Sequence, residues 1–187
     1  LTEAHSPLFG RVLVSSGFGV GGGVLASDAK AGKALLDVAE ELALRRSCPS
    51  IELRGGLLPK ARAGWKIRHD SHCGFVAPLA ADDEAQLTWI PRKQRAEVRK
   101  GLANDLDIAI GSGPDDRAAH YAVYAESVRN LGTPVFPRSL FDEVLDAFGQ
   151  DADILTVRHQ HKPVASVLSL YHKGAVMPYW GGGTWHA

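Results

Sequence analysis

The amino-acid sequence predicts a mixed α/β (α+β) fold in which hairpin-connected strands and amphipathic helices share one chain. Short segments rich in Val, Ile and Leu, which are typical of strands, recur along the 187 residues. Longer segments with apolar residues at helical spacing lie between them. The resulting order is β-β-α-β-β-α-β-α-α-β-β-β. Because a doubly wound parallel sheet requires strict alternation of strand and helix, this order predicts sheets that contain hairpins.

The first part of the chain is expected to hold one helix flanked by short strands. Asp28 is placed to cap a helix over about 29–46, because an aspartate side chain can accept a hydrogen bond from the first turn. The apolar residues of this helix predict one buried stripe, made of Leu35, Val38, Ala39 and Leu42. Strands are expected at 8–16, 24–26 and 50–54, with one or two more within 64–80.

The glycine-rich stretch SSGFGVGGGVLA contains the pattern G-x-G-x-x-G at Gly17, Gly19 and Gly22. In a dinucleotide-binding loop a helix begins within this pattern, so that its N-terminus meets the pyrophosphate. Here the next residues, Val24 to Ala26, favour a strand, and the helix starts later. We therefore interpret the glycines as a tight bend between two strands and not as a dinucleotide site.

The second part of the chain predicts three helical segments followed by three strands. A helical region over about 83–104 is interrupted by Pro91, which suits the first position of a new helix. Ser139 is placed to cap a helix that ends at Phe148, and Gly149 suits its C-terminal end. The other expected elements are a strand at 106–111, a helix from about 112–116 to Asn130, a hairpin of 153–160 with 162–172, and a strand at 175–183.

Composition narrows the class of protein. The formal net charge is +0, with 21 basic and 21 acidic residues, which argues against attraction of the whole chain to nucleic acid. Two cysteines, Cys48 and Cys73, are too few for a disulfide framework, so we expect a reduced, cytoplasmic protein. We expect no integral membrane segment, because no apolar run approaches 18 residues, and no signal peptide. Both ends suggest a piece of a longer protein.

The strongest local charge feature is IPRKQRAEVRKGL, residues 90–102. Arg92, Arg95 and Arg99 follow i, i+3, i+7 spacing and therefore share a helix face, and Lys93 and Lys100 flank it. Two interpretations stay open. The cations form a solvated helix face, or they bind an anion such as a phosphate, a nucleotide-linked sugar or an RNA end.

Metal and nucleophile motifs are weak in this sequence. RHDSHC offers His69, Asp70, His72 and Cys73 as zinc ligands, but on a strand His69 and His72 would point to opposite faces. No G-x-S-x-G elbow or P-loop occurs, and no histidine has a partner that the sequence makes visible. We therefore expect no metal site.

PYWGGGT, residues 178–184, ends the last predicted strand in two aromatic residues and three glycines. Core aromatic residues followed by a turn would account for this stretch. Equally, Gly181 and Gly182 would allow a ligand to approach the backbone closely, with Trp180 beside it.

Four segments, taken in order, resemble the FemAB-related proteins. They are LVSSGFGVGGGVLA, RKQRAEVRKG, YAVYAESVRNLGTPVFPRSLFDEVLDAF and KPVASVLSLYHKGAVMPYWGGGT. The sequence looks most like the bacterial subgroup associated with exosortase and PEP-CTERM exopolysaccharide systems. The resemblance runs across nearly the whole chain and depends on the ordered set of segments.

The resemblance implies a tandem pair of GNAT-like acyltransferase folds with mixed sheets. Residues 1–111 would be the first unit without its beginning, and residues 112–187 the second without its C-terminal half. Family members transfer an acyl or aminoacyl group to an amine, and the donor is left open between acyl-CoA and aminoacyl-tRNA. The coenzyme A loop of typical GNAT enzymes, [QR]-x-x-G-x-[GA], would follow the strand at 175–183, where the sequence ends.

We therefore expect a cytoplasmic N-acyltransferase that acts on a small-molecule or envelope-precursor amine in cell-envelope or exopolysaccharide biosynthesis, with tRNA as a further possible partner. Such a transfer needs an oxyanion donor and a proton acceptor, for which Tyr179 and the backbone from Trp180 to Gly182 are candidates by position. The candidate substrate-binding cations are Arg92, Lys93, Arg95, Arg99 and Lys100. The alternatives are a non-catalytic binding or scaffold protein that retains the fold, and an RNA-binding module.

Overall fold

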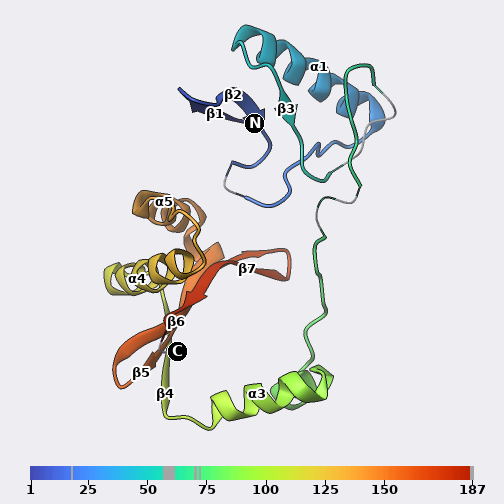
Figure 1. Ribbon diagram of the computed structural model, residues 1–187. Helices are drawn as coiled ribbons and strands as arrows, with labels where there is room; N and C mark the ends of the chain where they lie inside the picture. The colour runs from blue at the N-terminus through green and yellow to red at the C-terminus, as the bar shows by residue number, and fades with distance from the viewer. Residues whose placement is uncertain (18, 57–61, 70, 72, 186–187) are drawn as a thin grey trace. The chain divides into compact units, whose positions relative to one another are not determined.

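The chain forms two compact units, Leu1–Ala77 and Pro78–Ala187, each with its own sheet (Figure 1). This computed structural model describes residues 1–17, 19–56, 62–69, 71 and 73–185. The boundary between the two units therefore lies well before residue 111, which is where the sequence analysis placed the end of the first unit. The reason is that β4 (Leu106–Gly111) pairs along its whole length with β5 (Ala152–His159), so it belongs to the sheet of the second unit.

The first unit contains a small mixed sheet with the strand order β1-β2-β3. Strands β1 (Thr2–Ser6) and β2 (Gly10–Val14) form an antiparallel hairpin, whereas β3 (Ile51–Glu52) runs parallel to β2. Helix α1 (Ala29–Arg45) connects β2 to β3, as a parallel pair requires a crossover (Figure 1).

Two strand predictions in this unit are wrong, and β1 was not predicted. Residues 24–26 make only an isolated bridge, from Val24 to Gly56. The described residues between 64 and 80 form no strand. A strand needs a neighbour to satisfy its backbone groups, and apolar composition alone does not supply one. The interpretation of the glycine-rich stretch as a bend between two strands is therefore wrong for its second strand. The tight backbone packing is present, because a Cβ atom added at Gly23 would collide with the backbone carbonyl of Gly55.

Helix α1 begins where the sequence predicted it, but the face that it buries differs from the predicted one. The Asp28 carboxylate accepts a hydrogen bond from the Ala31 backbone N–H at 2.7 Å, which confirms the predicted cap. The predicted buried stripe is wrong at Leu35 and Val38, which are 48% and 55% exposed. The buried residues of α1 are Gly32, Leu36, Ala39 and Ala43. The buried face thus combines one large side chain, Leu36, with three small residues, which allow close packing along the rest of the helix.

Arg62 ties the segment around Trp65 to α1. Its Nε and Nη2 atoms donate to the two carboxylate oxygens of Glu40 at 2.7 and 2.6 Å, and Nη2 also donates to Asp37 at 2.7 Å. The indole N–H of Trp65 donates to Glu40 at 2.6 Å. The hydrogen bonds from Arg62, and then that from Trp65, lower the pKa of Glu40 to about 2.

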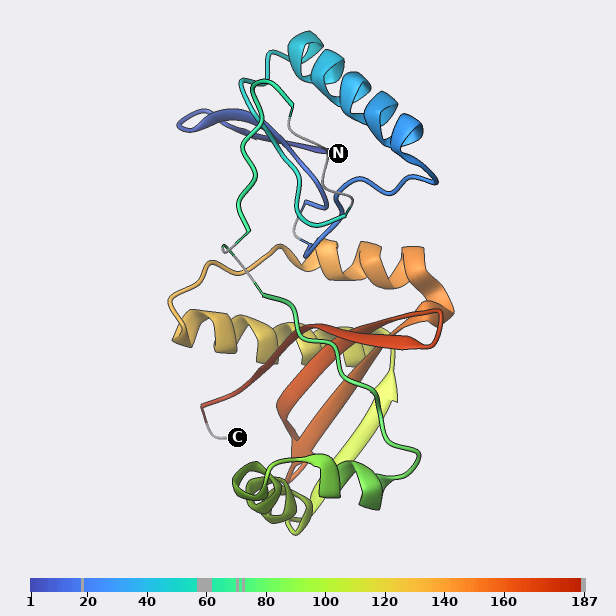
Figure 2. The ribbon, with the colours of Figure 1, turned by 90° about the vertical axis from the view of Figure 1, so that its right-hand side faces the viewer.

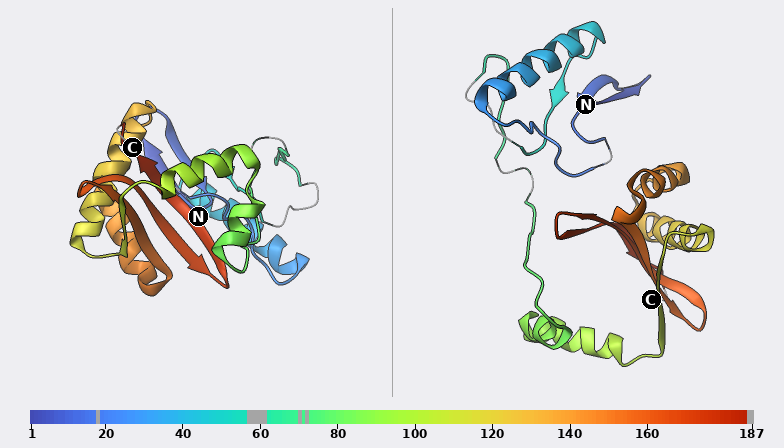
Figure 3. Two further views of the ribbon diagram at one scale, coloured as in Figure 1. Left: turned by 90° about the horizontal axis from the view of Figure 1, so that it is seen from below. Right: turned by 180° about the vertical axis from the view of Figure 1, so that it is seen from behind.

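The second unit contains a four-stranded sheet in the order β4-β5-β6-β7. Strands β6 (Lys162–His172) and β7 (Ala175–Gly183) have the predicted bounds and complete two successive hairpins. All pairs in this sheet are antiparallel, so the expected mixed pairing occurs only in the first unit. Helices α4 (Pro114–Asn130) and α5 (Arg138–Phe148) lie on one face of the sheet (Figures 2 and 3).

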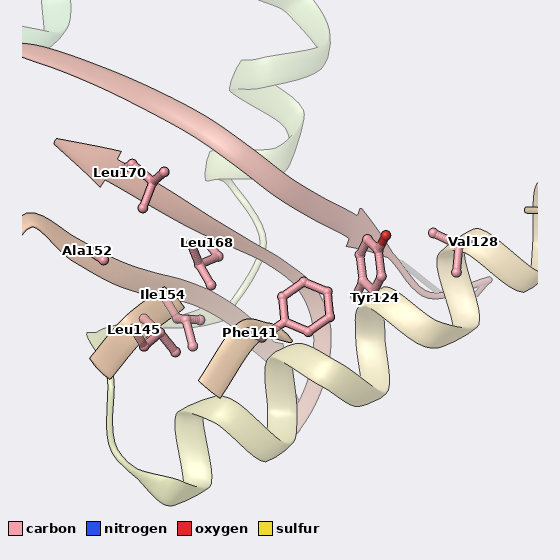
Figure 4. Close-up of a cluster of buried hydrophobic side chains, with 8 residues drawn as sticks. All are labelled: Tyr124, Val128, Phe141, Leu145, Ala152, Ile154, Leu168 and Leu170. Atoms are coloured by element: carbon pink, nitrogen blue, oxygen red, sulfur yellow. The ribbon is translucent and has the colours of Figure 1, made fainter. Parts of the chain in front are cut away.

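The main core of the second unit fills the space between these two helices and the sheet (Figure 4). Its buried members are Tyr124, Val128, Phe141, Leu145, Ala152, Ile154, Leu168 and Leu170. The ring of Phe141 is at the centre, with its centroid 5.0 Å from that of Tyr124 in an edge-to-face arrangement. Phe141 therefore joins α5 to both α4 and the strands.

Helices α2 (Asp83–Trp89) and α3 (Arg92–Leu102) precede the sheet. The predicted break at Pro91 is confirmed, although Pro91 is the N-cap of α3 and not its first helical residue. Similarly, α5 starts one residue before Ser139, with Pro137 as its N-cap, and Gly149 ends it with a positive φ of 54°. In the part of the chain that the structure describes, no helix is both long and apolar enough to cross a membrane.

Candidate functional site

Strand β7 is irregular at the point where the sequence placed the candidate catalytic tyrosine. Leu168 of β6 pairs with Trp180, but the next residue, Ser169, pairs with Pro178. Tyr179 is therefore an extra residue on β7, which makes a β-bulge. A bulge bends its strand and redirects side chains, and bulges are frequent beside active sites.

The two aromatic residues at the bulge pack against the main core. The centroid of the Trp180 ring is 5.6 Å from that of Phe141, and the two rings are almost perpendicular. The Tyr179 ring lies 4.5 Å from Trp180. Both aromatic side chains remain partly exposed. The core thus holds the bulge in place while leaving part of each ring accessible.

The glycines after the bulge are explained by contacts within the chain. A Cβ atom at Gly182 would lie 2.6 Å from the hydroxyl oxygen of Ser127 on α4, which is shorter than any van der Waals contact. At Gly181 a Cβ atom would lie 3.1 Å from the carbonyl oxygen of Ser166. The close approach at Gly182 is therefore that of helix α4, and Gly182 sets how near β7 lies to this helix.

An open groove of about 710 Å³ lies along the C-terminal half of α4 and the loop that follows it. Its lining residues are Ala122, Ala125, Glu126, Val128, Arg129, Gly132, Thr133, Pro134 and Val135. The Glu126 carboxylate accepts a hydrogen bond from the Trp185 backbone N–H at 2.8 Å, so the chain just after β7 meets the groove lining. The groove combines apolar walls with one carboxylate and one guanidinium, which suits a small ligand that carries a charged group.

A buried polar pair lies under α4, and the sequence analysis did not predict it. His120 is 1% exposed, and its Nδ1 atom is 3.0 Å from the hydroxyl oxygen of Ser166 on β6. The Ser166 hydroxyl is in turn 3.5 Å from that of Thr156 on β5. Nε2 of His120 has no hydrogen-bond partner among the described residues. Burial lowers the pKa of His120 to about 4, so this side chain is neutral at pH 7.

Only the position of His120 four residues before Tyr124 could have indicated its burial. The four-residue spacing places both rings on one helix face, and their centroids are 6.1 Å apart. Nothing in the sequence marks Ser166 as its partner, because the two residues are 46 positions apart.

The five predicted cations on α3 do not act as one group. The guanidinium of Arg95 donates to the backbone carbonyls of Thr88 and Ile90 at 2.5 and 2.8 Å, and so caps the end of α2. Lys100 pairs with Glu97 at 3.0 Å. Among the residues that the structure describes, the remaining cations have no hydrogen bond or ion pair; they are Arg92, Lys93 and Arg99.

The structure describes only two of the four candidate zinc ligands, His69 and Cys73. Asp70 and His72 lie outside the described residues. Cys73 is an exposed free thiol, and Cys48 is a buried one. Within the described residues, no group of three or more His, Cys, Asp or Glu side chains comes together.

The second unit thus has a helix pair inserted between the first and second strands of an antiparallel sheet, a bulge in its fourth strand, and a separate groove along α4. The family described as acetyltransferase (GNAT) domain matches residues 91–186, just over half of the chain. The chain therefore belongs to the GNAT acetyltransferase-domain family, whose general activity is N-acyl transfer. Such enzymes generally use an acyl-CoA donor and a small-molecule amine acceptor. No curated protein matches the chain.

Proposed function

We propose that the second unit transfers an acyl group from coenzyme A to a primary amine, at the bulged part of β7. The observation that carries this proposal is the bulge at Tyr179, followed on the chain by a segment that contacts the lining of the α4 groove. The family match covers β4 to β7 and both helices, so the elements that build this site all fall within it.

In the proposed reaction the amine nitrogen attacks the carbonyl carbon of the thioester. The ammonium form of the amine first releases one proton to water, which frees the nitrogen lone pair. The C–N bond then forms, the C–S bond breaks, and coenzyme A leaves as a thiolate that takes up a proton, while the nitrogen loses its second proton to form the amide. A general acid positioned at the leaving group accelerates such a step by about 10² to 10⁴-fold. We propose Tyr179 for this role, because it is partly exposed and lies on the bulge.

We propose that Glu126 holds the acceptor amine before transfer. Its carboxylate lines the groove, and one of its oxygens is already oriented by the Trp185 backbone. A carboxylate attracts an ammonium group, and a charge-assisted hydrogen bond orients it. Trp180, which is partly exposed beside Tyr179 on the bulge, is proposed as an apolar contact for the acyl group, and Gly181 and Gly182 as the backbone beside it.

The biological setting is proposed from the sequence resemblance. We propose a FemAB-like enzyme of the subgroup associated with exosortase and PEP-CTERM systems, acting in the cytoplasm on an envelope or exopolysaccharide precursor. Two free thiols fit a reducing compartment. Aminoacyl-tRNA is the alternative donor. We also propose that the first unit is GNAT-like, which its parallel β2-α1-β3 crossover supports.

The test uses the full chain with acetyl-CoA and a panel of amines, and follows the amide product by mass spectrometry. Glu126→Gln should raise KM for the amine about tenfold, since it removes a charge-assisted contact. Glu143→Gln removes an exposed carboxylate from α5 and is the matched control. Tyr179→Phe should lower kcat about a hundredfold or more while leaving KM nearly unchanged.

Failure of the test has a defined meaning. If the chain binds neither acyl-CoA nor aminoacyl-tRNA, the enzymatic proposal fails and a scaffold that retains the fold is favoured. If transfer occurs but both variants behave like Glu143→Gln, the reaction takes place away from β7 and the α4 groove.

A further inference from the structure

Helix α3 is a short helix without a packing surface of its own. The structure describes all eleven of its residues, and none is buried. An isolated helix of this length is marginal in water, because most helical stability in proteins comes from tertiary packing. A surface that covers α3 would therefore stabilise it.

The charge on α3 indicates an anionic partner. Arg92 and Lys93 occupy its first turn, where the helix dipole already places positive charge, and no acidic residue is present there. Together with Arg99 they have no hydrogen bond or ion pair among the described residues. This arrangement is unfavourable in isolation, and an anion beside the helix would relieve it.

Apolar side chains lie beside these cations. Val98 and Leu102 are four residues apart and so share a face, on which they are 37% and 63% exposed. Arg99 follows Val98 directly, so its side chain lies at the edge of this apolar face. Trp89, which is 59% exposed, comes just before α3. Tryptophan and a basic amphipathic helix are both favoured at the interface between a membrane and water.

We infer that α3 is a peripheral docking surface for an anionic lipid bilayer. Leu102 and Val98 enter the boundary between headgroups and acyl chains, and the free cations contact lipid phosphates. A free phosphate or a nucleic acid would use the cations but would leave the apolar pair in water. The combination of the two features therefore favours a lipid surface. The inference does not depend on acyl transfer, because vesicle binding requires no substrate.

The first experiment measures co-sedimentation of the full chain with vesicles of phosphatidylcholine, alone or mixed with phosphatidylserine. Binding is expected only to the mixed vesicles, and it should weaken with salt. The triple variant Arg92→Gln, Lys93→Gln, Arg99→Gln should bind about a hundredfold more weakly, at about fivefold per cation. The matched control, Lys30→Gln, Lys162→Gln, Lys173→Gln, removes the same charge from exposed positions elsewhere and should bind like the wild type.

The second experiment separates a lipid surface from a general anion site. Val98→Gln with Leu102→Gln keeps every charge and uses residues that favour helices. It should lose vesicle binding while keeping any weak binding to polyuridylate or inorganic phosphate. All five changed side chains of α3 are exposed, and circular dichroism verifies that each variant is folded. Equal vesicle binding by this variant and the wild type, equal loss in the two triple variants, or tighter binding to polyuridylate than to vesicles would each overturn the inference.

Discussion

The two units of the chain are stabilised by different kinds of contact. In the second unit, eight buried hydrophobic residues form one cluster around Phe141. Among the described residues of the first unit, the corresponding cluster consists of Leu13, Ala43 and Cys48, and an ion-pair network at Arg62 adds to it. Burial of apolar surface is little affected by salt, whereas exposed ion pairs are screened. We therefore expect the first unit to be the less stable and the more sensitive to solution conditions.

The largest effect is expected from Phe141→Ala. Phe141 lies on α5, is 2% exposed and contacts α4 and β7, so its removal leaves a cavity that costs about 3–5 kcal/mol in the free energy of unfolding. Phe148→Ala, on the same helix but 47% exposed, is the matched control. The destabilisation caused by each variant is measured by urea titration, with the unfolding of each unit followed by hydrogen exchange. Equal destabilisation by the two variants would contradict the role of the cluster.

The buried histidine gives the second unit a pH dependence of its own. Since the pKa of His120 falls from 6.5 in the unfolded chain to about 4 in the fold, the unfolded state binds more protons between these values. The contribution of neutral His120 to the free energy of unfolding is thus fully present above pH 6.5, and the free energy falls by up to about 3 kcal/mol as the pH approaches 4. His120→Leu should remove this slope. The free energy of unfolding is measured as a function of pH. The same slope in the wild type and in His120→Leu would contradict the assignment of this pH dependence to His120.

A smaller loss is expected from Gly182→Ala. The added methyl group would meet the Ser127 side chain, so either α4 or β7 must move, at a cost of about 1–3 kcal/mol. Gly101→Ala is the control, because a Cβ atom there meets no atom within 4 Å. In a helix it should be neutral or stabilising. Thermal unfolding compares the stability of the two variants. A Gly182→Ala variant as stable as the wild type would show that β7 and α4 are less closely packed.

The smallest effect is expected from Arg62→Gln, and it should be confined to the first unit. The pKa of Glu40 is lowered to about 2 by Arg62 and Trp65, so the ion pair stabilises the fold above about pH 4.5 and is lost as pH falls toward 2. The variant should show faster hydrogen exchange in α1 at neutral pH and low salt. This difference from the wild type should shrink in high salt. An effect that persists in high salt would mean that Arg62 acts through packing.

Local signals in the sequence predicted much of the second unit. The bounds of β4, β6 and β7 agree with the prediction, and Pro91 separates α2 from α3 as expected. These elements depend on periodicity, turns and proline, which act over a few residues. The division of the chain was harder, since the place of β4 depends on β5, more than 40 residues later.

In the candidate site, too, local sequence patterns did not predict contacts between distant residues. Sequence spacing placed Arg95 on a binding face, yet its guanidinium is used to cap α2. The Ser166 partner of His120 and the Ser127 contact of Gly182 are tertiary, so no local pattern indicates them. Leu35 and Val38 were expected to be buried, but α1 buries the neighbouring face that carries Leu36, Ala39 and Ala43.

The central claim is that β7 and the α4 groove of the second unit perform N-acyl transfer, and isotope-labelled acetyl-CoA tests it most directly. The account predicts that the full chain moves the labelled acetyl group to an amine, and that Glu126→Gln raises KM for that amine whereas Glu143→Gln does not. Transfer that is unaffected by Glu126→Gln and Tyr179→Phe would contradict the site. Absence of any labelled amide with either acyl-CoA or aminoacyl-tRNA as donor would contradict the function itself.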